Sequence, residues 1–196
     1  MFAVFTAVGS LLLMFSGNSM VLRPFLSPPE GRRGSIQTLM DWQGVQATLT
    51  QVVEEAFPEL YGTRVELRRV GPAWQRFFIC ITSPFASRIY AVRSALEMLP
   101  GQVLRGLLAH ELMHVLQFYP LSRLQRLWLA IQYVLSTRAR IRLERAADVG
   151  VIDRGCGEDL LAMRRYADAQ HPDRRPSDPR YLTADEIRVL IERRKA

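Results

Sequence analysis

The sequence predicts an α+β fold, in which a small β-sheet packs on one central helix and the C-terminal part of the chain is mainly helical. Short runs rich in β-branched and aromatic residues lie between residues 64 and 92. Before and after them, apolar residues recur at helical spacing. With 196 residues, of which 48% are hydrophobic, the chain can bury the core of one domain.

The part of the chain before residue 100 contains one expected helix and three expected strands. Ser35 is suited to cap a helix that reaches Glu55, and apolar residues at core spacing support this helix. The expected strands cover residues 64–70, 74–82 and 88–92. Gly71-Pro72 lies between the first two strands, which we therefore expect to be joined in a hairpin-like turn.

Three helices are expected after residue 100. The first runs from Gly101 to the stop at Pro120, and the second is a long helix over residues 121–152. An apolar stripe over residues 121–135 is too short to span a membrane, and we interpret it as core in preference to an interfacial helix. The last helix begins at a capping box, Thr183-Ala184-Asp185-Glu186.

The segment His110-Glu111-Leu112-Met113-His114 lies within the first of these helices. Side chains four residues apart lie on one face of an α-helix, about 6 Å apart along its axis, so both imidazoles can bind one cation. Glu111 then lies beside the cation, where a general base takes a proton from a metal-bound water. With three His and eleven Glu in the chain, chance produces this pattern only about a few times in a thousand. The motif therefore indicates a zinc hydrolase.

A zinc site used for hydrolysis has three protein ligands, so the third must come from another segment. Only one other histidine, His171, is present. Glu144 is the stronger candidate, because Asp148 follows it by one helical turn and can hold a zinc-bound histidine through a hydrogen bond. We expect one Zn²⁺ per chain, bound by His110, His114 and Glu144.

The HELMH motif, followed about thirty residues later by Glu144-Arg-Ala-Ala-Asp148, resembles the gluzincin metallopeptidases. Within them it is most similar to the HtpX-type membrane proteases and the CAAX prenyl endopeptidases. The resemblance covers about residues 89–180 and implies a zincin-like fold and an endopeptidase that hydrolyses peptide bonds in proteins or peptides. It also implies that His171, or an arginine behind it, donates to the oxyanion; the arginines are Arg174, Arg175 and Arg180.

Two features depart from the family pattern. Met113 stands where these proteases usually have a small residue, and this affects how the two ligand-bearing helices cross. The Asn-Ala pair of their substrate-binding strand is absent, and residues 88–92 occupy that region. The mode of substrate binding is therefore not carried over.

The N-terminal residues 1–22 are mostly apolar, and we expect them to form a hydrophobic anchor or a signal-like segment. Residues 23–35 then form a linker, and residues 36–196 a single zincin-like metallopeptidase domain. Arginines follow the apolar stretch, which favours a membrane-associated protein whose catalytic part is cytoplasmic. A true start at Met14 or Met20 would instead leave a soluble cytoplasmic protein.

The net charge of +7 does not by itself indicate a nucleic-acid partner, because the arginines are spread along the chain without a binding motif. The cluster Arg138, Arg140, Arg142 and Arg145 is interpreted as a solvated helix face in preference to a site for an anionic membrane. Two alternatives stay open: a non-catalytic, zinc-stabilised interaction protein, and a basic surface binder with an accidental motif. Cys80 and Cys156 are too few to define a disulfide scaffold.

Overall fold

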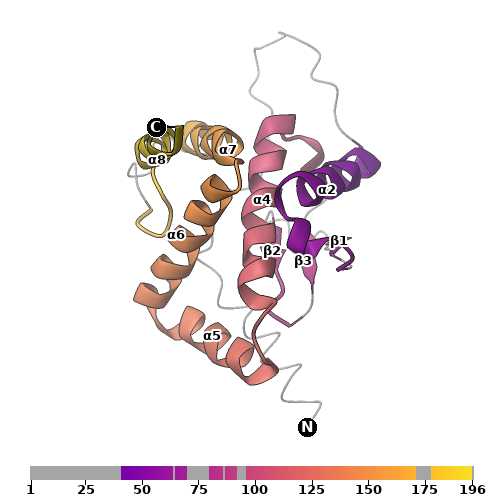
Figure 1. The fold of residues 1–196 in the computed structure, drawn as a ribbon, viewed down its shortest axis with the longest axis vertical. Coiled ribbons are helices and arrows are strands. Elements are labelled where there is room, and N and C mark those ends of the chain that lie inside the picture. The colour runs from indigo at the N-terminus through magenta and orange to yellow at the C-terminus, as the bar shows by residue number, and fades with distance from the viewer. Residues whose placement is uncertain are drawn as a thin grey trace.

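The computed structural model describes residues 41–63, 65–69, 80–85, 87–91, 96–170 and 178–195. Over these residues the protein is mostly helical and contains one small sheet (Figure 1). The elements are α2 (Trp42–Ala56), the 3-10 helix η1 (Pro58–Leu60), β1 (Glu66–Arg69), β2 (Cys80–Thr82), β3 (Arg88–Ala91), α4 (Gly101–Phe118), α5 (Arg123–Leu135), α6 (Thr137–Asp153), α7 (Gly157–Gln170) and α8 (Ala184–Lys195).

Several predictions lie outside the described residues. They concern the N-terminal segment 1–22, the linker 23–35, and the roles of His171 and of residues 174 and 175. The helix that reaches Glu55 begins at Trp42 and not after Ser35, because the side chain of Asp41 accepts a hydrogen bond from the N–H of Gly44 and caps the helix there. Among the helices that are described, none has both the length and the apolar character needed to cross a bilayer.

Helix α4, which carries the HELMH motif, has the extent that the apolar spacing predicted. It begins at Gly101 and ends at Phe118, just before Pro120. It packs on α2 and β2 on one side and on α6 and α7 on the other (Figure 1). Its buried apolar side chains are Val103, Leu104, Leu107, Leu108, Ala109, Leu112 and Val115. Because helices cover it on both sides, α4 carries its polar motif into the interior of the protein.

A close approach between α4 and α7 depends on Gly106, which lies one turn before His110. A Cβ atom at this position would overlap the carbonyl oxygen of Asp159 in α7 and lie 2.6 Å from its carbonyl carbon. Leu160, the next residue of α7, is fully buried and anchors that helix in the core. Neither backbone can therefore yield without separating the two helices.

We expect Gly106→Ala to destabilise the protein by about 3 kcal/mol or more, at the upper end of the range for overpacked cores, because the added methyl meets backbone atoms. Urea unfolding followed by circular dichroism measures the change. Gln102→Ala, at an exposed position of the same helix, is the control and should change the free energy of unfolding by less than about 0.5 kcal/mol. An unchanged midpoint for Gly106→Ala would mean that α4 and α7 do not touch at this point.

The described strands form one sheet in the order β1-β3-β2. Glu66 of β1 lies opposite Arg88 of β3 in a parallel pair, and Thr82 of β2 lies opposite Ile89 of β3 in an antiparallel pair. The predicted hairpin between the first two strands is therefore wrong. The third strand lies between the other two, so both of its edges are paired, and its side chains Ile89 and Ala91 are buried.

The predicted helix over residues 121–152 is two helices, because the chain breaks at Ser136. This residue is extended, with φ −121° and ψ 111°, and its side chain accepts a hydrogen bond from the N–H of Ala139. Arg140 donates back to the carbonyl oxygen of Tyr133 at the end of α5. The C-terminus of α5 and the N-terminus of α6 are thus both capped at the break, and α6 turns back alongside α4 (Figure 1).

Helix α5 exposes apolar side chains that the sequence placed in the core. The exposed ones are Leu124, Trp128, Ile131 and Leu135. Ala130 is the residue of this helix that is buried. The core interpretation of the stripe is therefore wrong, because the break at Ser136 leaves α5 at the end of the molecule opposite α8 (Figure 1).

Candidate metal centre

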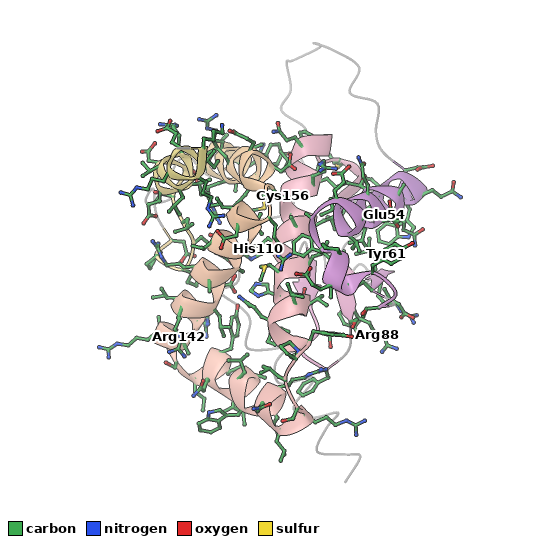
Figure 2. The ribbon with its side chains drawn as sticks, in the orientation of Figure 1. Glu54, Tyr61, Arg88, His110, Arg142 and Cys156 are labelled. Carbon is green, nitrogen blue, oxygen red and sulfur yellow. The ribbon has the colours of Figure 1, made fainter. Side chains whose placement is uncertain are left out.

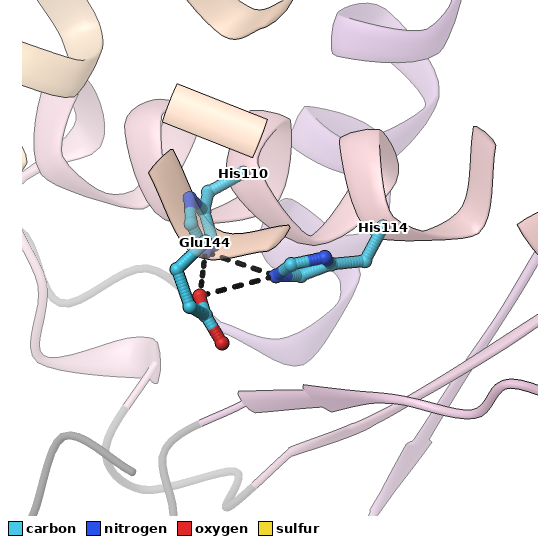
Figure 3. A group of neighbouring side chains, drawn as sticks. All are labelled: His110, His114 and Glu144. Atoms are coloured by element: carbon cyan, nitrogen blue, oxygen red, sulfur yellow. Dashed lines mark hydrogen bonds and ion pairs between the residues drawn. The ribbon is translucent and has the colours of Figure 1, made fainter. Parts of the chain in front are cut away.

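Three side chains from two helices meet at one point between α4 and α6 (Figure 3). His110 Nε2 lies 3.2 Å from His114 Nε2 and 3.1 Å from Glu144 Oε2, and His114 Nε2 lies 3.3 Å from the same oxygen. Tetrahedral zinc with bonds of about 2.0–2.1 Å places its ligand atoms about 3.3–3.4 Å apart. The triangle of donor atoms therefore has the size of one face of a zinc tetrahedron.

The two imidazoles are each held at the ring nitrogen that points away from this triangle. His110 Nδ1 lies 3.0 Å from Asp148 Oδ1, and His114 Nδ1 lies 2.9 Å from the side-chain oxygen of Gln117. Both partners are acceptors here, so each Nδ1 donates a proton to its partner and each Nε2 faces the triangle. Gln117 is itself fixed by a hydrogen bond to the carbonyl oxygen of Leu143. Both rings are thus oriented so that Nε2 binds a metal once the metal displaces its proton.

The charges of the cluster favour a cation at the same point. Burial lowers the pKa of His110, but hydrogen bonds to Asp148 and Glu144 outweigh this effect and raise the pKa to about 10. Burial also lowers the pKa of His114, and the charge of Glu144 reverses this to a net rise. For Glu144, burial raises the pKa, but the two imidazoles hold it well below its usual range. Two imidazoles and a carboxylate are also a regular zinc ligand set, so the site fits zinc.

The close packing of α4 on α6 depends on Gly150 of α6, which lies opposite Met113. A Cβ atom at Gly150 would lie 2.6 Å from the sulfur of Met113. With glycine at this position, the two helices approach closely enough for Glu144 to reach both histidines.

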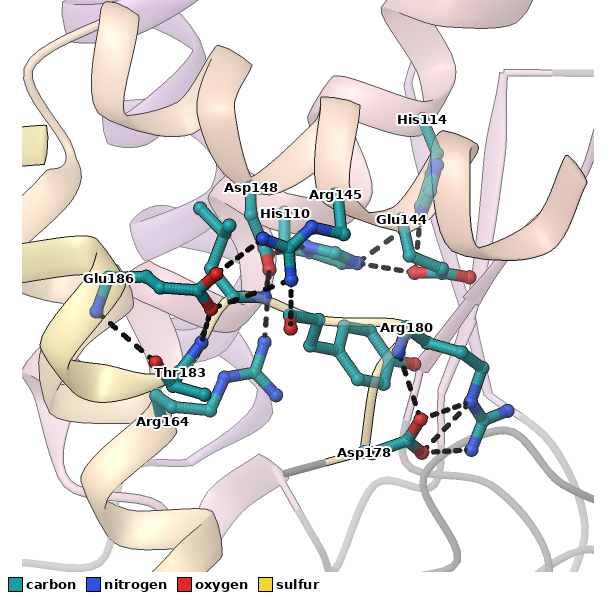
Figure 4. A network of polar contacts seen from close by, with 12 residues as sticks. His110, His114, Glu144, Arg145, Asp148, Arg164, Asp178, Arg180, Thr183 and Glu186 are labelled. Carbon is teal, nitrogen blue, oxygen red and sulfur yellow. Dashed lines mark hydrogen bonds and ion pairs between the residues drawn. The ribbon is translucent and has the colours of Figure 1, made fainter. Parts of the chain in front are cut away.

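Asp148 is fully buried and links the metal centre to α7 and to the chain before α8 (Figure 4). Its Oδ2 accepts hydrogen bonds from Arg164 Nη2 at 3.3 Å and from the backbone N–H of Leu182 at 2.8 Å. The guanidinium of Arg164 also lies 4.5 Å from the centre of the Tyr181 ring. Asp148 therefore holds His110 in place and is itself held from two directions.

Changing Asp148 to Asn should weaken zinc binding by about 10 to 100-fold, because the amide keeps the shape of the side chain and loses the charge that holds His110. Competition with a chromophoric chelator measures the zinc affinity. Asp153→Asn, at an exposed position of the same helix, is the matched control and should bind zinc like the wild type. A loss as large as that of a ligand variant would show that Asp148 contacts the metal directly.

Two tyrosines that the sequence did not single out border the centre. The Tyr133 hydroxyl donates to Glu144 Oε1 at 2.5 Å, which leaves Oε2 to face the imidazoles. The Tyr181 ring centre lies 5.9 Å from that of His110, and burial raises the pKa of its hydroxyl well above the usual range. Tyr133 thus selects which oxygen of Glu144 faces the site.

The expected general base, Glu111, lies on α4 and is buried. Its Oε2 accepts a hydrogen bond of 2.6 Å from the hydroxyl of Thr82 in β2, and the same hydroxyl lies 3.0 Å from the Glu111 carbonyl oxygen. The charge of Glu111 also contributes to the raised pKa of His114, after the larger effects of burial and Glu144. Thr82 is a third residue that the sequence did not reveal, because its partner Glu111 is distant in the chain.

The chain at the start of α8 is held on α6 by a separate network (Figure 4). Arg145 bonds the backbone oxygen of Tyr181 at 3.1 Å and Glu186 Oε1 at 2.5 Å. Thr183 and Glu186 exchange hydrogen bonds in the predicted capping box, which is confirmed. This network holds residues 181–183 beside α6, where the N–H of Leu182 donates to Asp148.

The Glu186 network should make stability fall in acid. Hydrogen bonds from Arg145, and then from the backbone of Thr183, lower the pKa of Glu186 from 4.5 to about 2. A depressed pKa contributes stability above about pH 4.5 that is lost as the pH falls through about 2. Because the side chain is 42% exposed, the effect should be only about 0.5–1 kcal/mol. Urea unfolding at pH 6 and pH 2 should show Glu186→Gln destabilised mainly at pH 6; an equal deficit at both would contradict this.

No protein-family model, curated protein or solved structure matches the chain. The site is therefore assessed on its geometry. The structure brings together four of the residues that the sequence predicted, namely His110, His114, Glu144 and Asp148.

Proposed function

We propose that the protein is a zinc-dependent peptidase of gluzincin type. The observation that carries this proposal is the triangle of donor atoms from His110, His114 and Glu144, with Glu111 buried next to the first histidine. A site that only stabilises a fold has no need of a buried carboxylate at that position. The zincin-like arrangement, with a small sheet beside the HExxH helix, supports the same proposal because β2 contacts α4.

When bound by these residues, zinc would polarise the scissile carbonyl and lower the pKa of a water toward about 7. Glu111 takes the proton of the attacking water and later delivers it to the leaving amine. The hydrogen bond from Thr82 keeps the Glu111 carboxylate in one orientation, so that its second oxygen is available for the proton. Asp148 and Gln117 keep the two imidazoles in the tautomer that binds metal.

Among the described arginines that follow His171, Arg180 has the arrangement expected of a donor to the oxyanion. Its Nη1 is buried without a hydrogen-bond partner among the described residues. Its guanidinium lies 5.7 Å from the centre of the Tyr181 ring, which itself lies 5.9 Å from the centre of the His110 ring. Asp178 holds the remaining nitrogens in place. Arg180 therefore donates to the developing oxyanion in the proposed reaction.

The proposed substrate is an extended segment of a peptide or protein. β2 is an edge strand of the described sheet, and its Thr82 lies against the general base. A peptide that adds to this edge by main-chain hydrogen bonds would place its backbone beside Glu111.

Cleavage of a diverse peptide library, followed by mass spectrometry, tests the proposal. We expect the zinc-loaded protein to cut a defined subset of peptides, the chelated protein to cut none, and restored zinc to restore cleavage. If the zinc-loaded protein binds one zinc and cuts nothing, the peptidase proposal fails and the non-catalytic, zinc-stabilised alternative replaces it.

A further inference from the structure

Helix α5 carries an apolar ridge that no described part of the chain covers. The ridge consists of Leu124, Trp128, Ile131 and Leu135, which are 79%, 61%, 36% and 80% exposed. Their spacing of four, three and four residues places them on one side of the helix. A single exposed apolar residue is ordinary on a protein surface, but four in one line form an interaction site.

The charged residues of α5 and of the chain on either side of it are of one sign. Residues 112–143 contain five arginines and neither aspartate nor glutamate. Three of these arginines, Arg123, Arg138 and Arg142, are exposed, and Arg142 extends outward from α6 (Figure 2). The other two hold the ends of the helix: Arg126 donates to the carbonyl oxygen of Leu121, and Arg140 to that of Tyr133.

These observations limit what can cover the ridge. In a symmetric pair of copies the same surface would face itself, so the three exposed arginines of each copy would approach those of the other without an acidic residue from this stretch to oppose them. An anionic bilayer can contact both features: its acyl chains cover the apolar ridge, and its phosphates pair with the arginines. At 13 residues, α5 is about 20 Å long, so it lies along the surface and does not cross it.

We infer that α5 is an interfacial helix, which docks this end of the protein on an anionic lipid bilayer. Trp128, in the middle of the ridge, is of the residue type that is enriched at the boundary between headgroups and acyl chains. The capping box of Ser122 and Gln125 and the two arginines at its ends keep the helix formed without a protein partner on its apolar side.

Docking at α5 places the metal centre next to the bilayer. The helix connects α4 and α6, which carry the three ligand residues. Tyr133, on the face of α5 that turns inward, donates to Glu144. This inference concerns lipid binding alone, so it stands or fails independently of peptide hydrolysis.

The test uses the full-length protein and a signal that arises at the ridge itself. The fluorescence difference between the wild type and Trp128→Phe isolates Trp128 from the other two tryptophans. With vesicles of phosphatidylglycerol and phosphatidylcholine, we expect this signal to shift to the blue and to be quenched by lipids brominated on their acyl chains. Vesicles of phosphatidylcholine alone should require a higher lipid concentration for the same quenching.

Variants separate the two contributions to binding. Leu124→Ser with Leu135→Ser should raise the lipid concentration for half-maximal quenching at least about tenfold, because two apolar side chains leave the bilayer. Arg138→Gln and Arg142→Gln should each raise it by about fivefold, and only for anionic vesicles. Val189→Ser, on exposed α8 at the other end of the molecule, is the control and should change nothing.

Three outcomes would overturn the inference. In the first, the protein floats with vesicles through its N-terminal residues while Trp128 is not quenched. In the second, neutral and anionic vesicles quench Trp128 equally. In the third, acrylamide fails to quench Trp128 without lipid, which would show that another segment or a second copy already covers the ridge.

Discussion

Changing His110, His114 or Glu144 to alanine should remove bound zinc, because each side chain supplies one of the three protein bonds. We expect about one zinc per chain in the wild-type protein and less than about a tenth of that in each variant after dialysis. Atomic emission spectroscopy on purified protein measures the content. The thermal unfolding temperature of the wild type should fall on chelation, and those of the three variants should not respond.

Glu192→Ala, which removes an exposed carboxylate on α8, is the matched control for the ligand variants and should retain full zinc. A folded Glu144→Ala protein with full zinc content would exclude this residue from the site. Because His110 and Glu144 are buried, circular dichroism of each zinc-free variant must accompany the metal analysis, so that loss of zinc is separated from loss of the fold.

Changing Glu111 to Gln should leave zinc content near one per chain and lower peptide hydrolysis by about 10² to 10⁴-fold. The amide keeps the shape of the side chain and can still bond the Thr82 hydroxyl, but it cannot accept a proton. The decisive comparison is cleavage of the same peptide by zinc-loaded wild type and variant. The loss should lie in kcat, since Glu111 acts on the water and not on substrate binding.

Two further variants sharpen this comparison. Glu54→Gln, at an exposed position on α2, makes the same chemical change away from the site and should not alter hydrolysis. Thr82→Val removes the hydrogen bond to Glu111 and should lower kcat by less than Glu111→Gln does, with zinc retained. Equal cleavage by the wild type and Glu111→Gln would show that Glu111 is not the general base.

The sequence by itself determined the features that depend on residues close together in the chain. The i, i+4 spacing of His110 and His114 follows from helical geometry, and the bounds of α4 follow from its apolar spacing and the proline after it. The capping box at Thr183 and Glu186 is equally local. Glu144 and Asp148 were predicted because they share a helix face, and this stayed true after the long helix proved to be two.

Only the tertiary structure decided which distant segments meet. The order β1-β3-β2, the packing of Thr82 on Glu111 and the contact of Tyr133 with Glu144 join residues that share no local pattern. Helix α7 was not predicted, although Glu158 and Asp159 in its first turn were a signal for it.

The exposure of α5 could not be deduced from its amphipathic pattern, because an apolar stripe looks the same whether a core or a bilayer covers it. The pattern is a property of the helix alone, and what covers it depends on where the break at Ser136 sends the following helix. The chemistry of the metal centre was therefore readable from short-range spacing. The residues that surround the metal centre are brought there by the packing of distant segments, which the spacing of apolar residues along one helix does not reveal.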